Sequence, residues 1–116
     1  LHAANATGLT ASTIRSAANS KAGIRVAGTS ANVTISDSLV GLNAAGNVAQ
    51  PNLGQGVIVS AATGTTLQDN TISGNTFYGI VVTGAAGSTT ITGNKIGLGT
   101  DGTTAIAERW LSRVPA

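Results

Sequence analysis

The chain has 116 residues, enough for one domain with a modest hydrophobic core. Six basic residues, four acidic residues and a single Phe, Tyr and Trp are too few for a nucleic-acid surface, which needs many phosphate contacts or stacked bases. Cysteine is absent, which excludes disulfides and thiolate metal sites, and no apolar run reaches the roughly 18 residues of a membrane span. We therefore expect no nucleic-acid partner and no membrane insertion.

An internal repeat organises the chain. A shift of 56 residues aligns the sequence with itself without a gap and places Ile24 on Ile80 and Gly41 on Gly97. Within this repeat, each unit opens on a glycine and an apolar run: GIRV (23–26), GVIV (56–59) and GIVV (79–82). Such self-similarity is the sequence signature of a repeat architecture. The repeat predicts a single domain over 1–116, with coils at about 1–22, 23–55, 56–78 and 79–102 and a further segment at 103–114.

Each unit contains short runs in which apolar and small polar residues alternate, bounded by Gly, Asn or Asp. Alternation predicts strands with one buried face. A strand of about four residues cannot bury that face alone, so successive coils must stack into a continuous core. Stacking puts equivalent residues about 4.8 Å apart in parallel ladders. The predicted internal columns are Ile24, Val57 and Ile80, and Ile35, Leu67 and Ile91.

A turn position recurs between the second and third strand of each coil. We assign to this position a structural ladder of Ser12, Ser38, Asn70 and Asn94. Asn tolerates left-handed backbone geometry, and its amide can bond to the same amide one coil away. These side chains are therefore predicted to join the coils to one another.

The runs NTISGNTFYGIVV (70–82) and TTITGNKIG (89–97) resemble the parallel β-helix repeats of the pectate-lyase-like superfamily, above all the Asn- and Gly-rich bacterial versions in large secreted or surface proteins. The resemblance covers about residues 7–106. It implies an all-β, right-handed parallel β-helix, a solenoid of about four coils, with an extracellular or cell-surface location. Such repeats occur in polysaccharide lyases, glycosidases, adhesins and proteins without known chemistry, so the resemblance implies a fold that several activities share.

The last segment departs from the repeat. Residues 103–114 have the pattern of a short amphipathic helix, which would cover the last coil as a lid. The candidate cap residues are Ile106, Trp110, Leu111 and Val114. The alternative is a disordered tail of foreign origin, because 107–116 match nothing in the repeats. Residues 1–6 offer no comparable cap, so we expect the first coil to associate with another molecule and the chain to form homo-oligomers.

A pair of carboxylates, Asp37 and Asp69, is the sharpest catalytic hypothesis. Equivalent positions in adjacent coils would bring them to about 5 Å, the separation of a retaining glycosidase pair. The alternative is that both residues form the turn, since Gly93 and Ala11 stand there in the other coils. We favour the turn because no conspicuous basic group is placed to assist catalysis. We therefore expect a protein that is not an enzyme.

The run 97–102 formally fits the GxGxxG pattern of a dinucleotide site. That site also needs a following helix in a βαβ unit and an acidic residue about 20 positions later, but the 116-residue sequence ends before that position, and the matching run 41–46 lacks the middle glycine. We interpret the run as a loop and expect no cofactor.

Two surface hypotheses remain beside a structural role. The TGT and TIT runs at 63–65 and 90–92 suggest a hydroxyl and methyl ladder that orders water, as in ice-binding solenoids, but we find no TxT spacing in register through every coil. Phe77 and Tyr78 are candidates for stacking on the sugar rings of a carbohydrate, which would make the chain a carbohydrate-binding or polysaccharide-processing β-helix. The interpretation that accounts for most features is a non-catalytic structural or self-associating module, part of a larger bacterial surface or secreted protein.

Overall fold

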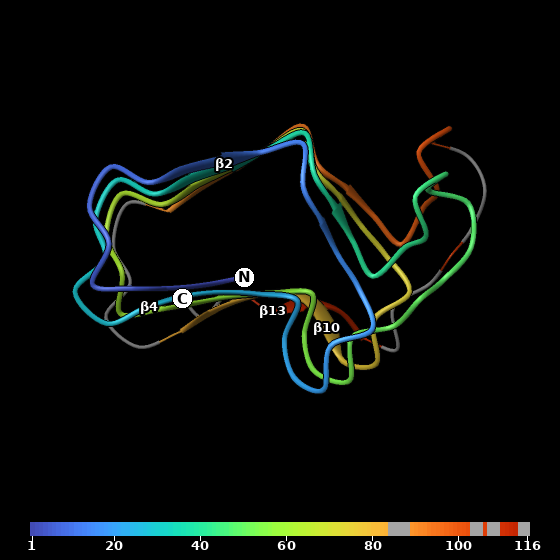
Figure 1. Ribbon diagram of the computed structural model, residues 1–116, viewed down its shortest axis with the longest axis horizontal. Coiled ribbons are helices and arrows are strands. Elements are labelled where there is room, and N and C mark those ends of the chain that lie inside the picture. The colour runs from blue at the N-terminus through green and yellow to red at the C-terminus, as the bar shows by residue number, and fades with distance from the viewer. Residues whose placement is uncertain (84–88, 103–105, 107–109, 114–116) are drawn as a thin grey trace.

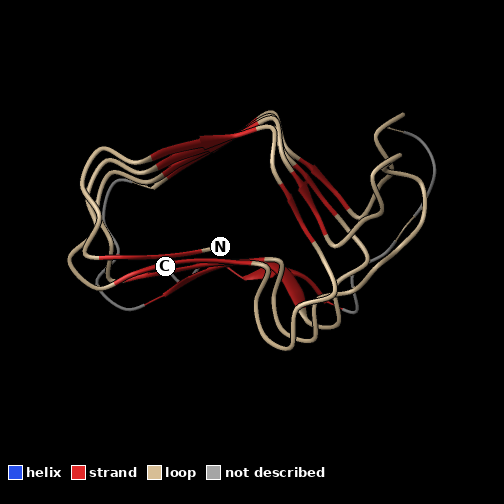
Figure 2. Ribbon diagram, viewed as in Figure 1, coloured by secondary structure: helices blue, strands red, loops and turns tan. Residues whose placement is uncertain are grey.

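The computed structural model describes residues 1–83, 89–102, 106 and 110–113. This part of the chain is all β, and short strands follow one another around three parallel sheets (Figures 1 and 2). Each turn of the chain contributes one strand to each sheet before the path returns one layer further along. The predicted parallel β-helix of about four coils is confirmed.

The three sheets are defined by their strands. The first sheet contains β1 (His2–Ala4), β4 (Ile24–Ala27), β7 (Val57–Ser60), β10 (Tyr78–Thr83) and β13 (Trp110–Arg113). The second contains β2 (Thr10–Ser12), β5 (Thr34–Ser36), β8 (Thr66–Gln68) and β11 (Thr90–Thr92). The third contains β3 (Arg15–Ser16), β6 (Leu39–Val40), β9 (Thr71–Ile72) and β12 (Lys95–Ile96).

The strand register places equivalent residues of successive coils side by side. Both predicted internal columns are confirmed: Ile24–Val57–Ile80 in the first sheet and Ile35–Leu67–Ile91 in the second. Ile91 is half-buried because its strand, β11, lies at the end of its sheet, whereas the other members are buried. Branched aliphatic side chains suit these positions because they pack well on a pleated surface.

The hydrophobic core runs through the inside of the solenoid between the three sheets. Its completely buried members also include Val26, Val33, Val40, Val59 and Ile72. Burying one such side chain stabilises the fold by roughly 1.5–3 kcal/mol relative to leaving it in water. A stack of short strands is therefore held together mainly along the axis of the solenoid.

Left-handed backbone positions recur at several turns of each coil, including turns on either side of the second sheet. The residues between the second and third sheets are Thr13, Asp37, Asp69 and Gly93, with φ values between 52° and 64°. Those before the second sheet are Gly8, Asn32 and Gly64, with φ values between 55° and 69°. Gly, Asn and Asp enter this region most readily, which explains their regular spacing in the sequence.

Longer excursions leave the second and fourth coils after the third sheet and stack on each other. The Thr100 N–H donates a hydrogen bond to the Gly46 carbonyl at 3.0 Å, and the Thr100 hydroxyl donates to the Ala45 carbonyl at 3.3 Å. The intervening third coil makes only a short turn at Gly74. A Cβ added to this glycine would lie 2.7 Å from the Ala49 Cβ, so the turn packs closely against the excursion of the second coil. Stacked excursions therefore form an outer layer that repeats in alternate coils.

The predicted capping helix over 103–114 is wrong where the structure describes it. Trp110–Arg113 form the strand β13, which pairs in parallel with β10, and the described residues contain no helix. The physical reason is that the edge of β10 offers unpaired N–H and C=O groups, while an isolated helix of about twelve residues is marginal in water. Ile106 is half-buried, and its N–H donates to the Gly97 carbonyl. Val114 lies outside the described residues.

Candidate functional site

The polar ladder at the turn between the second and third sheets joins successive coils. The Ser38 N–H donates to Asn70 Oδ1 at 3.0 Å, and the Asn70 N–H donates to Asn94 Oδ1 at 2.9 Å. Asn70 Nδ2 also donates to Asn94 Oδ1, and Asn94 Nδ2 donates to the Leu67 carbonyl. Ser38 and Asn70 are buried at 1% exposure, so these bonds satisfy groups that water does not reach.

Ser12 does not belong to this ladder, and our assignment of it is wrong by two residues. Ser12 pairs with Ser36, while Ile14 takes the position next to Ser38 and donates its N–H to Ser38 Oγ at 3.2 Å. A shift of two residues keeps every inward side chain inward, so hydrophobic alternation alone does not reveal it. The polar ladder consequently ends in an apolar residue at the first coil.

A second polar ladder, which the sequence analysis missed, lies where each coil enters the first sheet. Asn19 Nδ2 donates to Asn52 Oδ1 at 2.8 Å, and Asn52 Nδ2 donates to Asn75 Oδ1 at 2.7 Å. Asn52 Nδ2 also donates to the Ser16 carbonyl, and the Asn19 N–H donates to Asn52 Oδ1. Asn52 is completely buried, so this network is an internal structural element and not a binding surface.

This second ladder has a signal in the sequence, which is a glycine at a fixed distance after each asparagine. Each Asn is followed four positions later by a glycine: Asn19 by Gly23, Asn52 by Gly56 and Asn75 by Gly79. A Cβ on Gly23 would lie 2.6 Å from Asn52 Nδ2 and 2.8 Å from Val40 Cγ1. A Cβ on Gly56 would lie 2.8 Å from Asn75 Nδ2. The spacing of four residues between Asn and Gly therefore indicates that an asparagine amide packs against the backbone of a glycine, where no Cβ would fit.

The two carboxylates Asp37 and Asp69 follow β5 and β8 at equivalent positions. Both have left-handed backbones, with φ of 52° and 55°, and both are exposed. Each backbone N–H donates to the next coil, from Asp37 to the Gln68 carbonyl and from Asp69 to the Thr92 carbonyl. Their geometry is that of turn residues, and it gives them a structural role whatever else they do.

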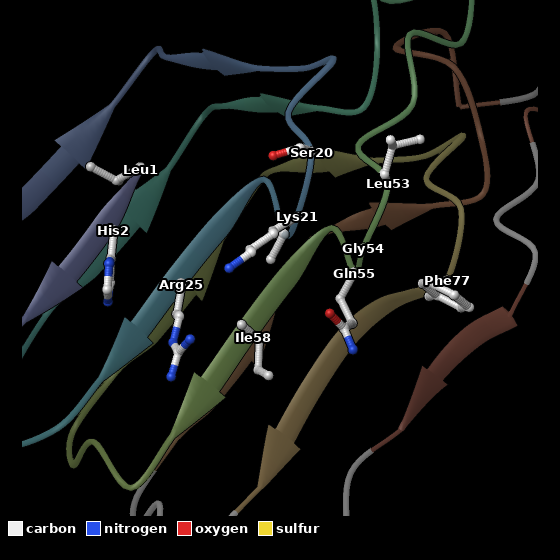
Figure 3. A pocket seen from close by; sticks show the side chains of 11 residues that line it. Leu1, His2, Ser20, Lys21, Arg25, Leu53, Gly54, Gln55, Ile58 and Phe77 are labelled. Atoms are coloured by element: carbon white, nitrogen blue, oxygen red, sulfur yellow. The ribbon is translucent and has the colours of Figure 1, made fainter.

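A groove of about 550 Å³ lies over the outer face of the first sheet (Figure 3). His2, Arg25 and Ile58 stand in a row across β1, β4 and β7 and form its floor. Lys21 comes from the turn before β4, and the large apolar side chains of Leu53 and Phe77 line it from later turns, at 59% and 41% exposure. The groove combines cations with exposed apolar surface, and its lining includes no carboxylate.

Of the two aromatic residues proposed for carbohydrate stacking, one lines the groove and the other does not. Phe77 lines it, whereas Tyr78 belongs to β10, is half-buried and is not among its lining residues. Sequence reasoning found Phe77 but missed Lys21, Arg25 and Leu53, because nothing in their spacing indicates that stacked turns bring them to one surface. A groove of this size is typical of a small-ligand site.

Within the described ranges, no group of three or more His, Asp or Glu side chains is placed to hold a metal ion. None of the described elements is a helix of the length and apolarity needed to cross a bilayer.

Parallel coils, inward aliphatic columns and amide ladders at the turns define a parallel β-helix. The family model described as the right-handed β-helix region matches residues 1–96, which is most of the chain, and the chain belongs to this family. The match also confirms the predicted right-handed sense. No curated protein and no solved structure matches the chain.

Proposed function

We propose that this chain is a non-catalytic structural module of a larger bacterial surface or secreted protein, and that it associates with a second copy of itself through the first coil. The observation that carries this proposal is the incomplete burial of that coil. Among the described residues, β1, β2 and β3 are the outermost strands at one end of the three sheets. Their outer edges therefore offer backbone N–H and C=O groups to a partner.

The side chains at this end match that interpretation. Leu9 and Ala11 are only half-buried, although the residues that stand next to them in the second coil, Val33 and Ile35, are completely buried. Among the described residues, the apolar columns are therefore only partly covered at this face. Apolar surface of this kind is stabilised when another surface excludes water from it.

The end of the polar ladder favours a second copy as the partner. In each step of the ladder, a side-chain oxygen accepts the N–H of the preceding coil, as Ser38 does from Ile14. Ile14 has no such oxygen, so the ladder ends in an apolar side chain at this face. Two such apolar faces can cover each other in a two-fold, self-complementary contact, which supports a second copy as the partner.

The test is the solution mass of the 116-residue chain, measured by light scattering on a size-exclusion column across a range of concentrations. We expect a discrete dimer, because a two-fold contact closes on itself. Ile14→Asp places a charge in the contact and is expected to give a monomer with an unchanged far-ultraviolet circular dichroism spectrum. Val48→Asp is the matched control, because Val48 is 56% exposed and lies in the excursion after the third sheet, outside the strands of the first coil.

A clean monomer at all concentrations would contradict the proposal. So would a dimer that Ile14→Asp leaves intact, since the contact would then lie elsewhere. If Ile14→Asp unfolds the chain, Leu9→Asp serves as the second variant, because Leu9 is also half-buried at the same end.

A carbohydrate-binding role is the second candidate, favoured by the groove over the first sheet. Phe77 offers an exposed ring there, and Lys21 and Arg25 would suit an acidic sugar. Electrophoresis in gels that contain acidic or neutral polysaccharides separates the two functions. A structural module migrates at the same rate in every gel, whereas a carbohydrate-binding protein is retarded in one of them.

A further inference from the structure

The outer face of the second sheet carries hydroxyl groups in register in every coil. Its outward columns are Thr10–Thr34–Thr66–Thr90 and Ser12–Ser36–Gln68–Thr92. All of these residues except Gln68 bear a hydroxyl, and none is charged. Each member is exposed or half-buried, so the face is open to solvent.

As expected from the sequence, the Thr-x-Thr spacing does not pass through every coil: it occurs in β11, whereas β2 and β5 have Thr-x-Ser and β8 has Thr-x-Gln. What recurs in all four strands is the first threonine of the spacing. The TGT run at 63–65 is not part of this face. Thr63 lies in a turn bridged to Ala31, and Thr65 is completely buried.

The two columns form a regular grid. Neighbouring parallel strands are about 4.8 Å apart, and residues at i and i+2 of one strand are about 6.6 Å apart. Threonine is branched at Cβ and has few rotamers, so its hydroxyl and methyl groups keep fixed directions. The buried column of Ile35 and Leu67 lies directly beneath and fixes the strands that carry the grid.

The enrichment in hydroxyls belongs to this sheet and not to the solenoid in general. The corresponding outward columns of the first sheet are His2–Arg25–Ile58–Val81 and Ala4–Ala27–Ser60–Thr83. The outward column of the third sheet is Arg15–Leu39–Thr71–Lys95. Threonine is favoured in strands for its shape, and this preference acts on all three sheets alike. It does not explain why one face bears hydroxyls at every position but Gln68 and no charge, while the other two faces are mixed.

We propose that the outer face of the second sheet is a binding site for crystalline water, that is, for the surface of ice. The hydroxyls of one column repeat at the inter-strand spacing of about 4.8 Å, which is similar to the distance between second-neighbour oxygens in ice. Hydroxyls can take the place of lattice water molecules, and the methyl groups between them release loosely held water on contact. A charged side chain in the grid would hold its own hydration shell instead, and none is present in these columns. This proposal does not depend on the self-association of the first coil.

The experiment is partition of the 116-residue chain between slowly growing ice and liquid, together with the shape of single ice crystals in its solution. We expect the chain to enter the ice at several times the level of a non-binding protein and to facet the crystals. The double variant Thr34→Tyr/Thr66→Tyr places two large rings in the grid and is expected to lose both effects. Ser60→Tyr is the matched control, because Ser60 lies in β7 on the outer side of a different sheet.

Two results would overturn the proposal. One is exclusion of the original chain from ice, and the other is equal partition of the double variant and the control. Circular dichroism checks that both variants are folded, and Thr66→Lys serves as a second variant if the double variant is not. Binding of the original chain to insoluble cellulose or chitin, without partition into ice, would assign the face to a crystalline polysaccharide and would also overturn the proposal.

Discussion

The hydroxyl of Thr65 is enclosed in the core without a hydrogen-bond partner among the described residues. Its neighbour in the preceding coil is Val33, because Thr34 pairs with Thr66 one position later. Valine has nearly the same shape as threonine but no group that needs a partner. We expect Thr65→Val to raise the free energy of unfolding by about 1 kcal/mol, because an unsatisfied buried hydroxyl is removed. Urea unfolding measures the change.

The reverse substitution in the neighbouring coil is the control for this prediction. Val33→Thr introduces a second buried hydroxyl and is expected to lower the free energy of unfolding by about 1–2 kcal/mol. Loss of stability in Thr65→Val would contradict the prediction and would mean that the hydroxyl has a partner in solution, such as a buried water molecule.

At this scale, the sequence predicted which residues face inward but not the register of the first coil. Inward positions repeat every second residue, so a slip of two positions leaves the pattern intact. The left-handed turn residue is the marker that resolves such a slip. Asp37, Asp69 and Gly93 are usual in that conformation, but the first coil uses Thr13, a branched residue that rarely adopts it.

The amide ladder of Asn19, Asn52 and Asn75 is the element that ties the coils together at the entry to the first sheet. We expect Asn52→Ala to lower the free energy of unfolding by roughly 3 kcal/mol or more. Its removal leaves the partly buried Asn19 N–H without its acceptor, and it takes one of two hydrogen bonds from the Ser16 carbonyl and one from Asn75 Oδ1. Thermal and urea unfolding both report the loss.

An exposed amide provides the comparison. Asn47 bonds to Asn43 at the surface of the first excursion, where water replaces a lost partner. Asn47→Ala is expected to change the free energy of unfolding by no more than about 0.5 kcal/mol. Similar losses for Asn47→Ala and Asn52→Ala would show that the ladder contributes little beyond ordinary surface bonds.

Elements inside the repeat were predictable because each copy supports the others. The strand that follows the repeat was not predictable, since the apolar residues in that segment also fit the period of a helix. The sequence does not show that the edge of β10 is left unpaired by the preceding coils, and this edge determines that Trp110–Arg113 form a strand. The groove was also unpredictable, because it depends on how turns from separate coils lie over one sheet.

For the whole molecule, stability should depend on position along the solenoid, since each coil contacts only its neighbours. Ile35 and Ile91 belong to the same column, but Ile35 is completely buried between two coils and Ile91 is half-buried at its end. We expect Ile35→Ala to cost about 2–5 kcal/mol in the free energy of unfolding and Ile91→Ala less than half as much.

Equilibrium unfolding in urea distinguishes this prediction from its alternative. Equal costs for the two identical changes would mean that the end coil is as well covered as the middle. It would imply that another segment or molecule packs over Ile91 in solution.

The outer layer of stacked excursions has a consequence for how such a chain can lengthen. Contacts such as that between Gly46 and Thr100 join alternate coils, and the matching residues Gly46 and Gly102 are 56 positions apart. A duplication of the gene segment for one coil would set two long or two short coils side by side and break the outer layer. A duplication of a coil pair would preserve every contact. We therefore expect such a chain to lengthen by two coils at a time, although a single coil is the repeating unit of the structure.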